Sequence, residues 1–247
     1  MHCQPRHYLQ VYNWLKITHT CLLCDERCAA AYPLCAACRA DLPWLGSHCD
    51  VCALPLVTSG LTCGQCLRHP PAFTQVQAAW RYAFPLDSLI SRFKHQARWP
   101  YGRLLAQLLA EQLLLAFAAG LASPDALLPV PLARQRLRQR GFNQAGLLAR
   151  WLGQALRLPV EDDWLRRTRD TPAQQSLDAA SRQRNLRNAF ALSPQARVAG
   201  RHLALVDDVL TTGTTAHTLA RLMLRAGATR VDVYCLARTP KPDERPG

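Results

Sequence analysis

Four cysteine pairs near the N-terminus constrain the folding of this chain more than any other feature of its sequence. Each pair has Cys-x-x-Cys spacing, and successive pairs begin 14 residues apart. Two thiolates at this spacing on a tight turn hold one tetrahedral metal ion together with a second such pair. The predicted metal ligands are Cys21, Cys24, Cys35, Cys38, Cys49, Cys52, Cys63 and Cys66.

Eight thiolates suit two metal ions, and zinc is the ion that we predict for both sites. So short a segment has little core of its own, so metal binding would supply much of its folding free energy. An iron–sulfur cluster is the alternative; four evenly spaced pairs disfavour free thiols or a redox pair. We favour consecutive pairs around each zinc, with interleaved pairing as the alternative. Cys28 and Cys235 fall outside the pattern and are predicted to be structural.

The compartment bears on how the cysteines are interpreted. The first residues lack an apolar segment followed by a small-residue cleavage site, so no secretory signal is predicted. No apolar run reaches the roughly 18 residues that a membrane span requires. We therefore expect a cytoplasmic protein without membrane insertion, in which clustered cysteines indicate a metal rather than disulfides.

Positive charge is concentrated in the C-terminal part of the chain. The net charge is +13, but residues 1–73 contain five Lys or Arg and four Asp or Glu, and so contribute only +1. Residues 74–247 contain 25 basic and 13 acidic residues and contribute +12. An anionic partner is therefore expected for the C-terminal part: a phosphorylated metabolite, pyrophosphate or nucleic acid.

The sequence predicts two domains. Residues 1–73 would contain an amphipathic helix within 1–20 and the cysteine module, which ends at a linker containing Pro70 and Pro71. Residues 74–247 alternate short apolar strands with helices, which predicts an α/β domain with a largely parallel sheet. Strands are expected at 78–83, 127–130, 203–206 and 230–236, and helices at 85–98, 101–121, 143–156 and 215–225.

A strand, two acidic residues and a turn of small residues follow one another at positions 203–215. The apolar strand 203–206 ends in Asp207 and Asp208, and a Thr/Gly turn then leads into a helix. Backbone N–H groups at such a helix start bind phosphate, and adjacent carboxylates accept hydrogen bonds from vicinal ribose hydroxyls. The alternative is a simple helix cap formed by Thr214 or Thr215, with solvated aspartates. We favour a sugar-phosphate site.

This stretch closely resembles the 13-residue phosphoribosyl pyrophosphate (PRPP) motif of type I phosphoribosyltransferases. The chain as a whole, over about residues 15–238, resembles the ComF family, also called the competence protein F or GntX-like family. Further matching positions are Tyr82, Phe93, Lys94, Pro129, Val130, Pro131, Arg140, Gly141, Phe142, Asn143, Gln144, Gln174, Leu177, Arg182, Asn185 and Phe190. The resemblance implies a double zinc ribbon followed along the chain by a domain with the type I phosphoribosyltransferase fold.

The resemblance also implies roles for individual residues. Asp207 and Asp208 would hold the ribose 2′- and 3′-hydroxyls, and Mg²⁺ would accompany PRPP. Residues 129–132 match the position of a pyrophosphate-contacting loop, and Arg140 is a candidate for that contact. Arg182, within a predicted mobile lid at 169–188, would close over the ligand and assist catalysis. The 5-phosphate would be held by Thr211, Thr212, Gly213, Thr214 and Thr215.

Three functions follow from these expectations. The first is a transferase that displaces pyrophosphate from C1 of PRPP, with an acceptor that the sequence does not identify. The second, which the family's link to natural transformation and DNA use also implies, is a non-catalytic factor associated with single-stranded DNA and a competence helicase. The third is a zinc-ribbon scaffold with a degenerate transferase fold, which the intact acidic pair and Thr/Gly turn disfavour.

Overall fold

The computed structural model describes residues 19–29, 31–168 and 189–240. The helix expected within residues 1–20 falls almost wholly outside this range, and the lid expected at 169–188 does so entirely. The described chain divides into two compact units, residues 1–42 and 43–247. The sequence predicts a domain boundary at residue 73, and that boundary stays a prediction.

The smaller unit surrounds the first cysteine cluster. It contains a two-residue antiparallel ladder and one short helix: β1 (His19–Thr20), β2 (Arg27–Cys28) and α2 (Ala36–Ala40). The side chain of Cys35 caps α2 by accepting a hydrogen bond from the backbone N–H of Cys38, 3.4 Å away. Elements this short have too few hydrogen bonds to be stable alone.

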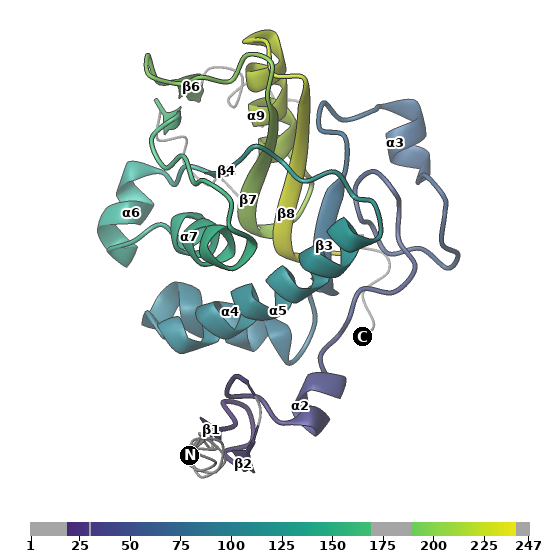
Figure 1. Cartoon of the computed structure of the whole chain (residues 1–247), viewed down its shortest axis with the longest axis vertical. Coiled ribbons are helices and arrows are strands. Elements are labelled where there is room, and N and C mark those ends of the chain that lie inside the picture. Colours follow the sequence, from purple (N-terminus) through teal and green to yellow (C-terminus); the bar gives the residue numbers. More distant parts are fainter. Residues whose placement is uncertain (1–18, 30, 169–188, 241–247) are drawn as a thin grey trace, which may run out of the picture. The chain divides into compact units, whose positions relative to one another are not determined.

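The larger unit is built on a four-stranded parallel sheet in the order β3-β8-β7-β4 (Figure 1). Its strands are β3 (Val76–Arg81), β4 (Ala126–Pro129), β7 (His202–Leu210) and β8 (Arg230–Arg238). Nearly every residue of β8 is buried because helices cover both faces, as in other parallel sheets. The predicted α/β class is confirmed, and all four predicted strands are present with boundaries shifted by a few residues.

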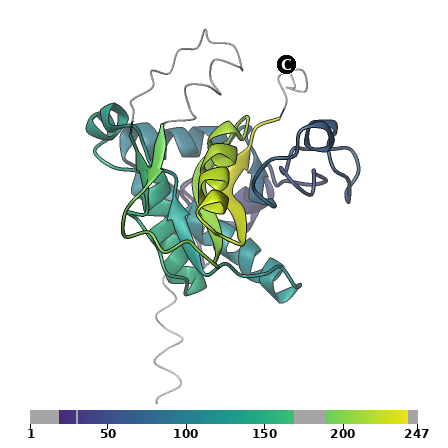
Figure 2. The ribbon, with the colours of Figure 1, turned by 90° about the horizontal axis from the view of Figure 1, so that it is seen from above.

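Helices α4, α5 and α7 form a layer on one face of the sheet, and α9 covers the other face (Figures 1 and 2). The helices are α3 (Gly64–Arg68), α4 (Leu86–Gln96), α5 (Trp99–Ala118), α6 (Arg134–Arg140), α7 (Gln144–Leu156) and α9 (Thr214–Arg225). A small antiparallel ladder, β5 (Leu165–Arg167) with β6 (Phe190–Leu192), accompanies them. Of these elements, the sequence did not predict α3, α6, β5 or β6. Among the described helices, none combines the length and apolarity needed to cross a bilayer.

The segment before the second cysteine cluster is joined to the edge of the sheet. The backbone N–H of Leu45 donates to the carbonyl of Ala79 (2.9 Å), and that of Arg81 donates to Pro43 (2.9 Å). The rings of Trp44 and Trp80 lie 5.2 Å apart. These contacts cover the open edge of β3, which would otherwise expose unpaired backbone groups.

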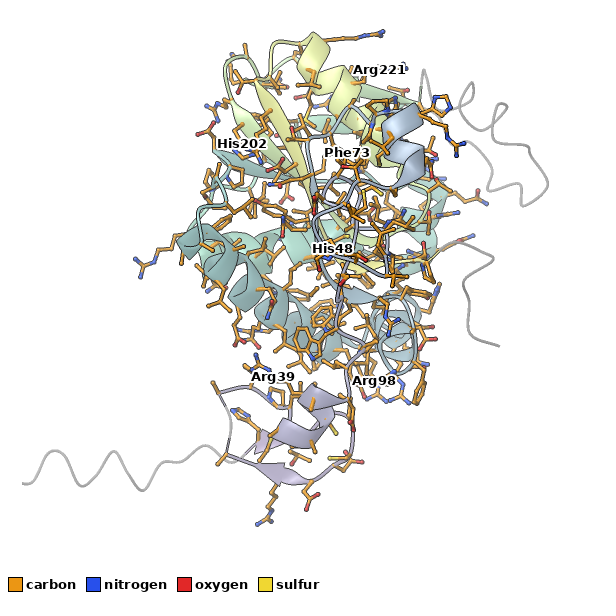
Figure 3. The ribbon with its side chains drawn as sticks, turned by 90° about the vertical axis from the view of Figure 1, so that its right-hand side faces the viewer. Arg39, His48, Phe73, Arg98, His202 and Arg221 are labelled. Atoms are coloured by element: carbon orange, nitrogen blue, oxygen red, sulfur yellow. The ribbon has the colours of Figure 1, made fainter. Side chains whose placement is uncertain are left out.

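A charged cluster fixes the amino ends of β7 and β8. Asp232 is fully buried, and its carboxylate lies 2.9 Å from Nε2 of His202 (labelled in Figure 3) and 3.0 Å from a guanidinium nitrogen of Arg230. Burial alone would raise the pKa of Asp232, but the hydrogen bonds from His202 and Arg230 lower it below its ordinary value. This end of the sheet is opposite to the end at which β7 carries Asp207 and Asp208.

Candidate functional site

Asp207 and Asp208 lie near the carboxyl end of β7, the edge at which open α/β sheets bind ligands. Each carboxylate accepts a hydrogen bond from the next backbone N–H, at 2.8 Å from Asp208 N to Asp207 and 2.7 Å from Val209 N to Asp208. The other oxygen of Asp208 forms a 2.8 Å ion pair with Nζ of Lys94 in α4. Both aspartates are half-buried, so each keeps access to a ligand at this edge.

The two carboxylates differ from ordinary surface aspartates in their proton affinity. Burial, and next the neighbouring charge of Asp208, raise the pKa of Asp207 to about 8. Lys94 opposes this shift but does not cancel it. Such a raised pKa distinguishes Asp207 from a solvated surface carboxyl, and perturbed pKa values cluster at functional sites.

We expect Asp207→Asn to stabilise the fold above pH 8. Because its folded pKa is raised, the stability associated with protonated Asp207 is present below its unfolded pKa of 3.8 and is lost as pH rises toward about 8. The asparagine side chain cannot ionise, so the variant avoids this loss of stability. Its free energy of unfolding in urea at pH 8.5 should therefore exceed that of wild type by about 1–3 kcal/mol. Asp232→Asn is the control, with the opposite sign, because its folded pKa is lowered. Equal unfolding free energies for wild type and Asp207→Asn at pH 8.5 would refute the raised pKa of Asp207.

The turn after β7 presents backbone and hydroxyl groups at the start of α9. Gly213 precedes the helix with φ of 75°, a left-handed conformation that favours glycine, and it has no side chain to cap the helix. The hydroxyls of Thr212 and Thr214 lie 2.8 Å apart, and Thr211 and Thr212 are exposed. The predicted alternative, a cap formed by Thr214 or Thr215, is absent from this described turn, because the cap position is Gly213. The backbone N–H of Thr214 donates to Oγ1 of Thr212 (3.4 Å), and no cap side chain occupies the remaining amides of this turn, which are therefore available to an anion.

The segment after β4 reaches the same edge. Val130 donates its backbone N–H to Val206 (2.9 Å), and its carbonyl accepts from the Asn143 side chain (3.1 Å). Helix α6 follows, and its last residue, Arg140, is half-buried. Burial lowers the pKa of Arg140, whereas the charge of Asp208 raises it, which places this guanidinium within electrostatic reach of the acidic pair.

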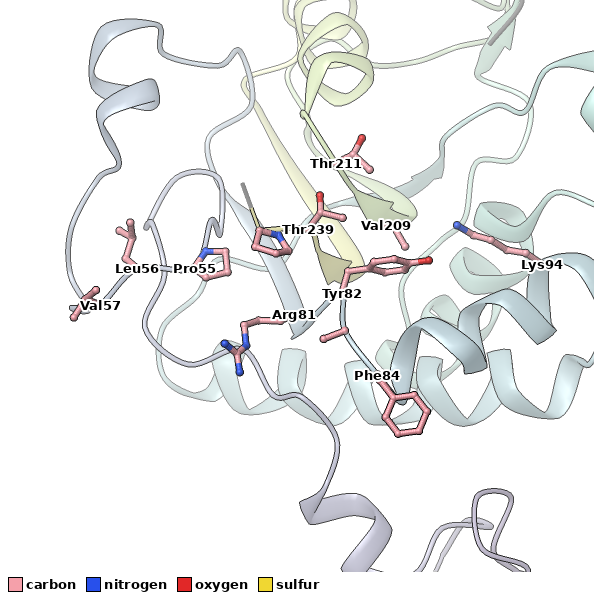
Figure 4. Close-up of a pocket in the computed structure, with 12 residues that line it drawn as sticks. Pro55, Leu56, Val57, Arg81, Tyr82, Phe84, Lys94, Val209, Thr211 and Thr239 are labelled. Atoms are coloured by element: carbon pink, nitrogen blue, oxygen red, sulfur yellow. The ribbon is translucent and has the colours of Figure 1, made fainter. Parts of the chain in front are cut away.

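A cavity of about 1020 Å³ opens at the carboxyl ends of β3, β7 and β8 (Figure 4). Lys94 and Thr211 lie on its side nearest Asp208, and Tyr82 and Phe84 follow β3. The ring of Phe84 is 79% exposed, so the cavity presents an aromatic face that no described side chain covers. Its lining consists of Pro55, Leu56, Val57, Arg81, Tyr82, Ala83, Phe84, Lys94, Val209, Thr211, Thr239 and Pro240.

The eight predicted cysteine ligands gather into two clusters, and consecutive pairs combine as we favoured. Within each cluster every sulfur lies within 4.8 Å of the others. Sulfurs of Cys24 and Cys35 are 3.7 Å apart, as are those of Cys52 and Cys63. Four thiolates at Zn–S bonds of about 2.3 Å would be separated by about 3.8 Å, so the described residues fit a tetrahedral zinc ion.

The thiols within each cluster differ in proton affinity. Burial raises the pKa of Cys21 and Cys49, but backbone N–H donors outweigh it and lower the values to about 6 and about 7. Burial and neighbouring thiols raise the pKa of Cys38 and Cys66. A cation at the centre of each cluster would resolve this conflict, because zinc binds cysteine as thiolate.

The structure thus brings together most of the predicted site, and it adds two residues. Asp207, Asp208 and Arg140 meet around one edge, whereas Arg182 lies outside the described residues. Lys94 is among the positions that match the family, but the sequence analysis assigned it no role. The feature that could have singled it out is the rarity of lysine, since only three of the 30 basic residues are lysines. Arg238, which contacts the turn after β7, had no sequence signal, because an arginine at a strand end usually faces solvent.

Comparison with known proteins agrees with this architecture. The chain matches a double zinc ribbon domain over residues 16–67 and a phosphoribosyl transferase domain over residues 137–246. A solved glutamine PRPP amidotransferase from B. subtilis aligns with 54% of this chain and 25% of that chain, at 21% identity and a TM-score of 0.37. That similarity is too distant to bear on ligand or activity. The two cysteine clusters are the structural zinc sites of the ribbon.

Three curated relatives cover most of this chain. DNA utilization protein YhgH of Escherichia coli K12 is 39% identical over 227 residues, 91% of this chain and 99% of that protein. Competence protein F of Haemophilus influenzae is 35% identical over 210 residues, 84% and 86% of the two chains. Competence protein ComFC of Bacillus subtilis is 26% identical over 248 residues, 89% and 95% of the two chains. With its zinc ribbon and its phosphoribosyltransferase domain, this chain belongs to the ComF family, together with YhgH and competence protein F.

Proposed function

We propose that this protein binds PRPP at the carboxyl end of β7 and acts as a phosphoribosyltransferase-like component of DNA uptake or of the use of DNA as a nutrient. The observation that carries the proposal is the half-buried pair Asp207 and Asp208, followed directly by an uncapped Thr/Gly turn and α9. Carboxylates suit the vicinal hydroxyls of a ribose, and the turn suits its 5-phosphate. The names of the relatives, which concern DNA utilization and competence, support the biological setting.

Each group of the ligand has a candidate partner. Asp207 and Asp208 accept hydrogen bonds from the ribose 2′- and 3′-hydroxyls. Lys94 and Arg140, both within reach of Asp208, face the more negative pyrophosphate end. Residues 129–132, beside the same edge, form the backbone loop next to that pyrophosphate. The 5-phosphate is held by Thr211, Thr212, Gly213, Thr214 and Thr215.

The corresponding reaction is a displacement at C1 of the ribose. An acceptor nucleophile bonds to C1 while the C1–O bond to pyrophosphate breaks, and pyrophosphate leaves with the bonding electron pair. Mg²⁺ bound with PRPP would neutralise charge on the leaving group. Lys94 and Arg140 stabilise the same charge, Asp207 and Asp208 orient the sugar, and the Asp208 carboxylate offsets positive charge on its ring. Arg182 remains our candidate for a residue that closes over the site. The cavity beside Tyr82 and Phe84 is where we place the acceptor.

Thermal unfolding with and without PRPP tests this function. A ligand that binds only the folded state raises the melting temperature in a concentration-dependent manner. We expect PRPP with Mg²⁺ to raise it by several degrees and ribose 5-phosphate, which lacks the pyrophosphate, to raise it less. Release of pyrophosphate from PRPP with a panel of nucleobases or single-stranded DNA would then identify the acceptor. No shift with PRPP at millimolar concentration would refute PRPP binding.

A second candidate, a non-catalytic factor that binds single-stranded DNA, is favoured by helix α6. Four of its seven residues are arginines, and Arg136 and Arg138 are exposed. DNA binding through several phosphates would weaken steeply between low and physiological salt, whereas PRPP binding in a pocket would weaken less. Substituting Arg136 and Arg138 by glutamine should reduce the salt dependence of DNA binding and leave PRPP binding intact. A competence helicase is the protein partner that this candidate function predicts.

We place the protein's site of action in the cytoplasm. None of the ten described cysteines forms a disulfide, and eight of them form the two clusters. Zinc thiolates persist in reducing compartments, whereas an oxidising one would convert such closely spaced thiols to disulfides. Fractionation of cells followed by detection of the protein would test the placement.

A further inference from the structure

Arg238 is a buried cation at the end of β8, with 6% of its surface exposed. Its Nε donates to the backbone carbonyl of Cys52, a ligand of the second zinc cluster, at 2.9 Å. One of its terminal nitrogens donates to the carbonyls of Leu210 (3.1 Å), Thr211 and Thr239 (2.7 Å). One guanidinium therefore connects a zinc knuckle with the residues that lead into the proposed phosphate-binding turn.

The charge of Arg238 needs a partner that these contacts do not provide. Every hydrogen-bond acceptor recorded for it among the described residues is an uncharged oxygen, and no described carboxylate lies within ion-pair distance. A buried charge without a counter-ion is costly. Four thiolates around one Zn²⁺ have a net charge of −2, and the loaded second cluster would supply the missing negative charge.

The second cluster and the turn also border a common space. A cavity of about 240 Å³ is lined by Cys52 and Cys66 of the cluster, by Thr212 and Gly213 of the turn, and by Arg238. Phe73 (labelled in Figure 3) contributes to the same wall, and a Cβ placed at Gly213 would lie 3.8 Å from its ring. A structural change in the second cluster can therefore affect the turn through side chains that line the same cavity.

We propose that Arg238 is a positioning residue through which the second zinc ion holds the phosphate-binding turn in its ligand-competent conformation. The part that concerns PRPP rests on the proposed function. The zinc thiolates stabilise the guanidinium, and the guanidinium fixes the carbonyls of Leu210 and Thr211. Zinc in the second cluster and ligand on the turn then strengthen each other's binding, as linkage requires. The first cluster, in the separate unit 1–42, has no described counterpart of Arg238 and provides an internal control.

The test combines zinc release with PRPP binding. In a Cys24→Ser/Cys38→Ser background the full-length protein should retain one zinc, so release of zinc to a colorimetric chelator reports the second cluster alone. We expect Arg238→Gln to accelerate this release by about tenfold or more, because loss of a group that supports a metal ligand weakens metal binding by 10–100-fold. Arg238→Lys, which keeps the charge but loses the planar array of guanidinium N–H donors, should have an intermediate effect.

The matched control is Arg230→Gln, which removes an arginine from the opposite end of the same strand. It should leave zinc release unchanged. In the otherwise unaltered chain, Arg238→Gln should weaken PRPP binding by about tenfold and increase hydrogen exchange in residues 210–216, with two zinc ions still bound at saturation. If the Gln variant does not fold, the Lys variant is measured in the same way.

The outcomes separate this inference from the proposed function. Faster zinc release and faster exchange in residues 210–216 in a protein that does not bind PRPP would support the coupling and refute the function. Normal PRPP binding with unchanged zinc release in both Arg238 variants would refute the coupling and leave the function intact. Equal acceleration by Arg230→Gln would also refute it, because the effect would then be one of general stability.

Discussion

Replacing Asp207 and Asp208 together by alanine is expected to reduce PRPP binding by at least about 100-fold. At pH 8.5, above the pKa of Asp207, each carboxylate contributes charge-assisted hydrogen bonds to a ribose hydroxyl, and two such interactions are worth about 3–6 kcal/mol. Calorimetric titration of zinc-loaded wild type and variant with PRPP and Mg²⁺ measures the difference. The fold should survive, because the substitution removes a half-buried carboxyl whose ionisation destabilises it.

The chain offers a matched control for this experiment. Asp162 and Asp163 form another adjacent acidic pair; they are exposed, and Asp162 pairs with the exposed Arg150. Alanine at both positions removes the same formal charge from exposed carboxylates outside the proposed ligand site, so PRPP affinity should change by less than about twofold. Similar losses in both double variants would indicate a general charge effect and would contradict the assignment of the site.

Removal of zinc by a strong chelator is expected to unfold residues 19–42 and to loosen, without unfolding, the larger unit. The smaller unit has only short elements around its first cluster, so most of its folding free energy comes from the metal, about 10–16 kcal/mol for structural zinc in isolated fingers. The second cluster is embedded in a hydrophobic core with residues of the sheet, and we expect this core to persist without metal. Hydrogen exchange followed by mass spectrometry resolves the two responses.

The expected pattern is full exchange in residues 19–42, increased exchange in 46–68, and continued protection in β7 and β8. Elemental measurement should give two zinc ions per chain before chelation. Cys28→Ser, at a cysteine outside both clusters, should retain both ions. Protection of 19–42 that is insensitive to complete metal removal would contradict a structural role for the first zinc.

Local patterns in the sequence predicted the features whose signals are local. The Cys-x-x-Cys spacing gave the zinc ligands, and the apolar stretches gave all four strands of the sheet, because burial on both faces demands continuous hydrophobicity. The acidic pair and Thr/Gly turn lie where a strand must end and a helix must begin, so their relative placement follows from the order of residues alone.

Features that depend on contacts between residues far apart in the chain could not be predicted from the sequence. The ion pair of Lys94 with Asp208 and the contact of Arg238 with Cys52 join residues from different elements, and no periodicity encodes them. Helix α6 was missed because Leu137 is the only apolar residue among its arginines and glutamines, so it has no hydrophobic period. The attachment of residues 43–45 to the edge of β3 was likewise invisible, since cysteine spacing describes a ribbon and not what it packs against.

The central claim is that a ribose 5-phosphate ligand lies across the carboxyl end of β7, and a crystal structure of the zinc-loaded protein with PRPP and Mg²⁺ tests it most directly. The account predicts the two ribose hydroxyls within hydrogen-bond distance of Asp207 and Asp208, and the 5-phosphate on residues 211–215. Lys94 should then have left its ion pair with Asp208 for the pyrophosphate. An empty turn at PRPP concentrations that saturate binding in solution, or a ligand bound elsewhere in the molecule, would contradict it.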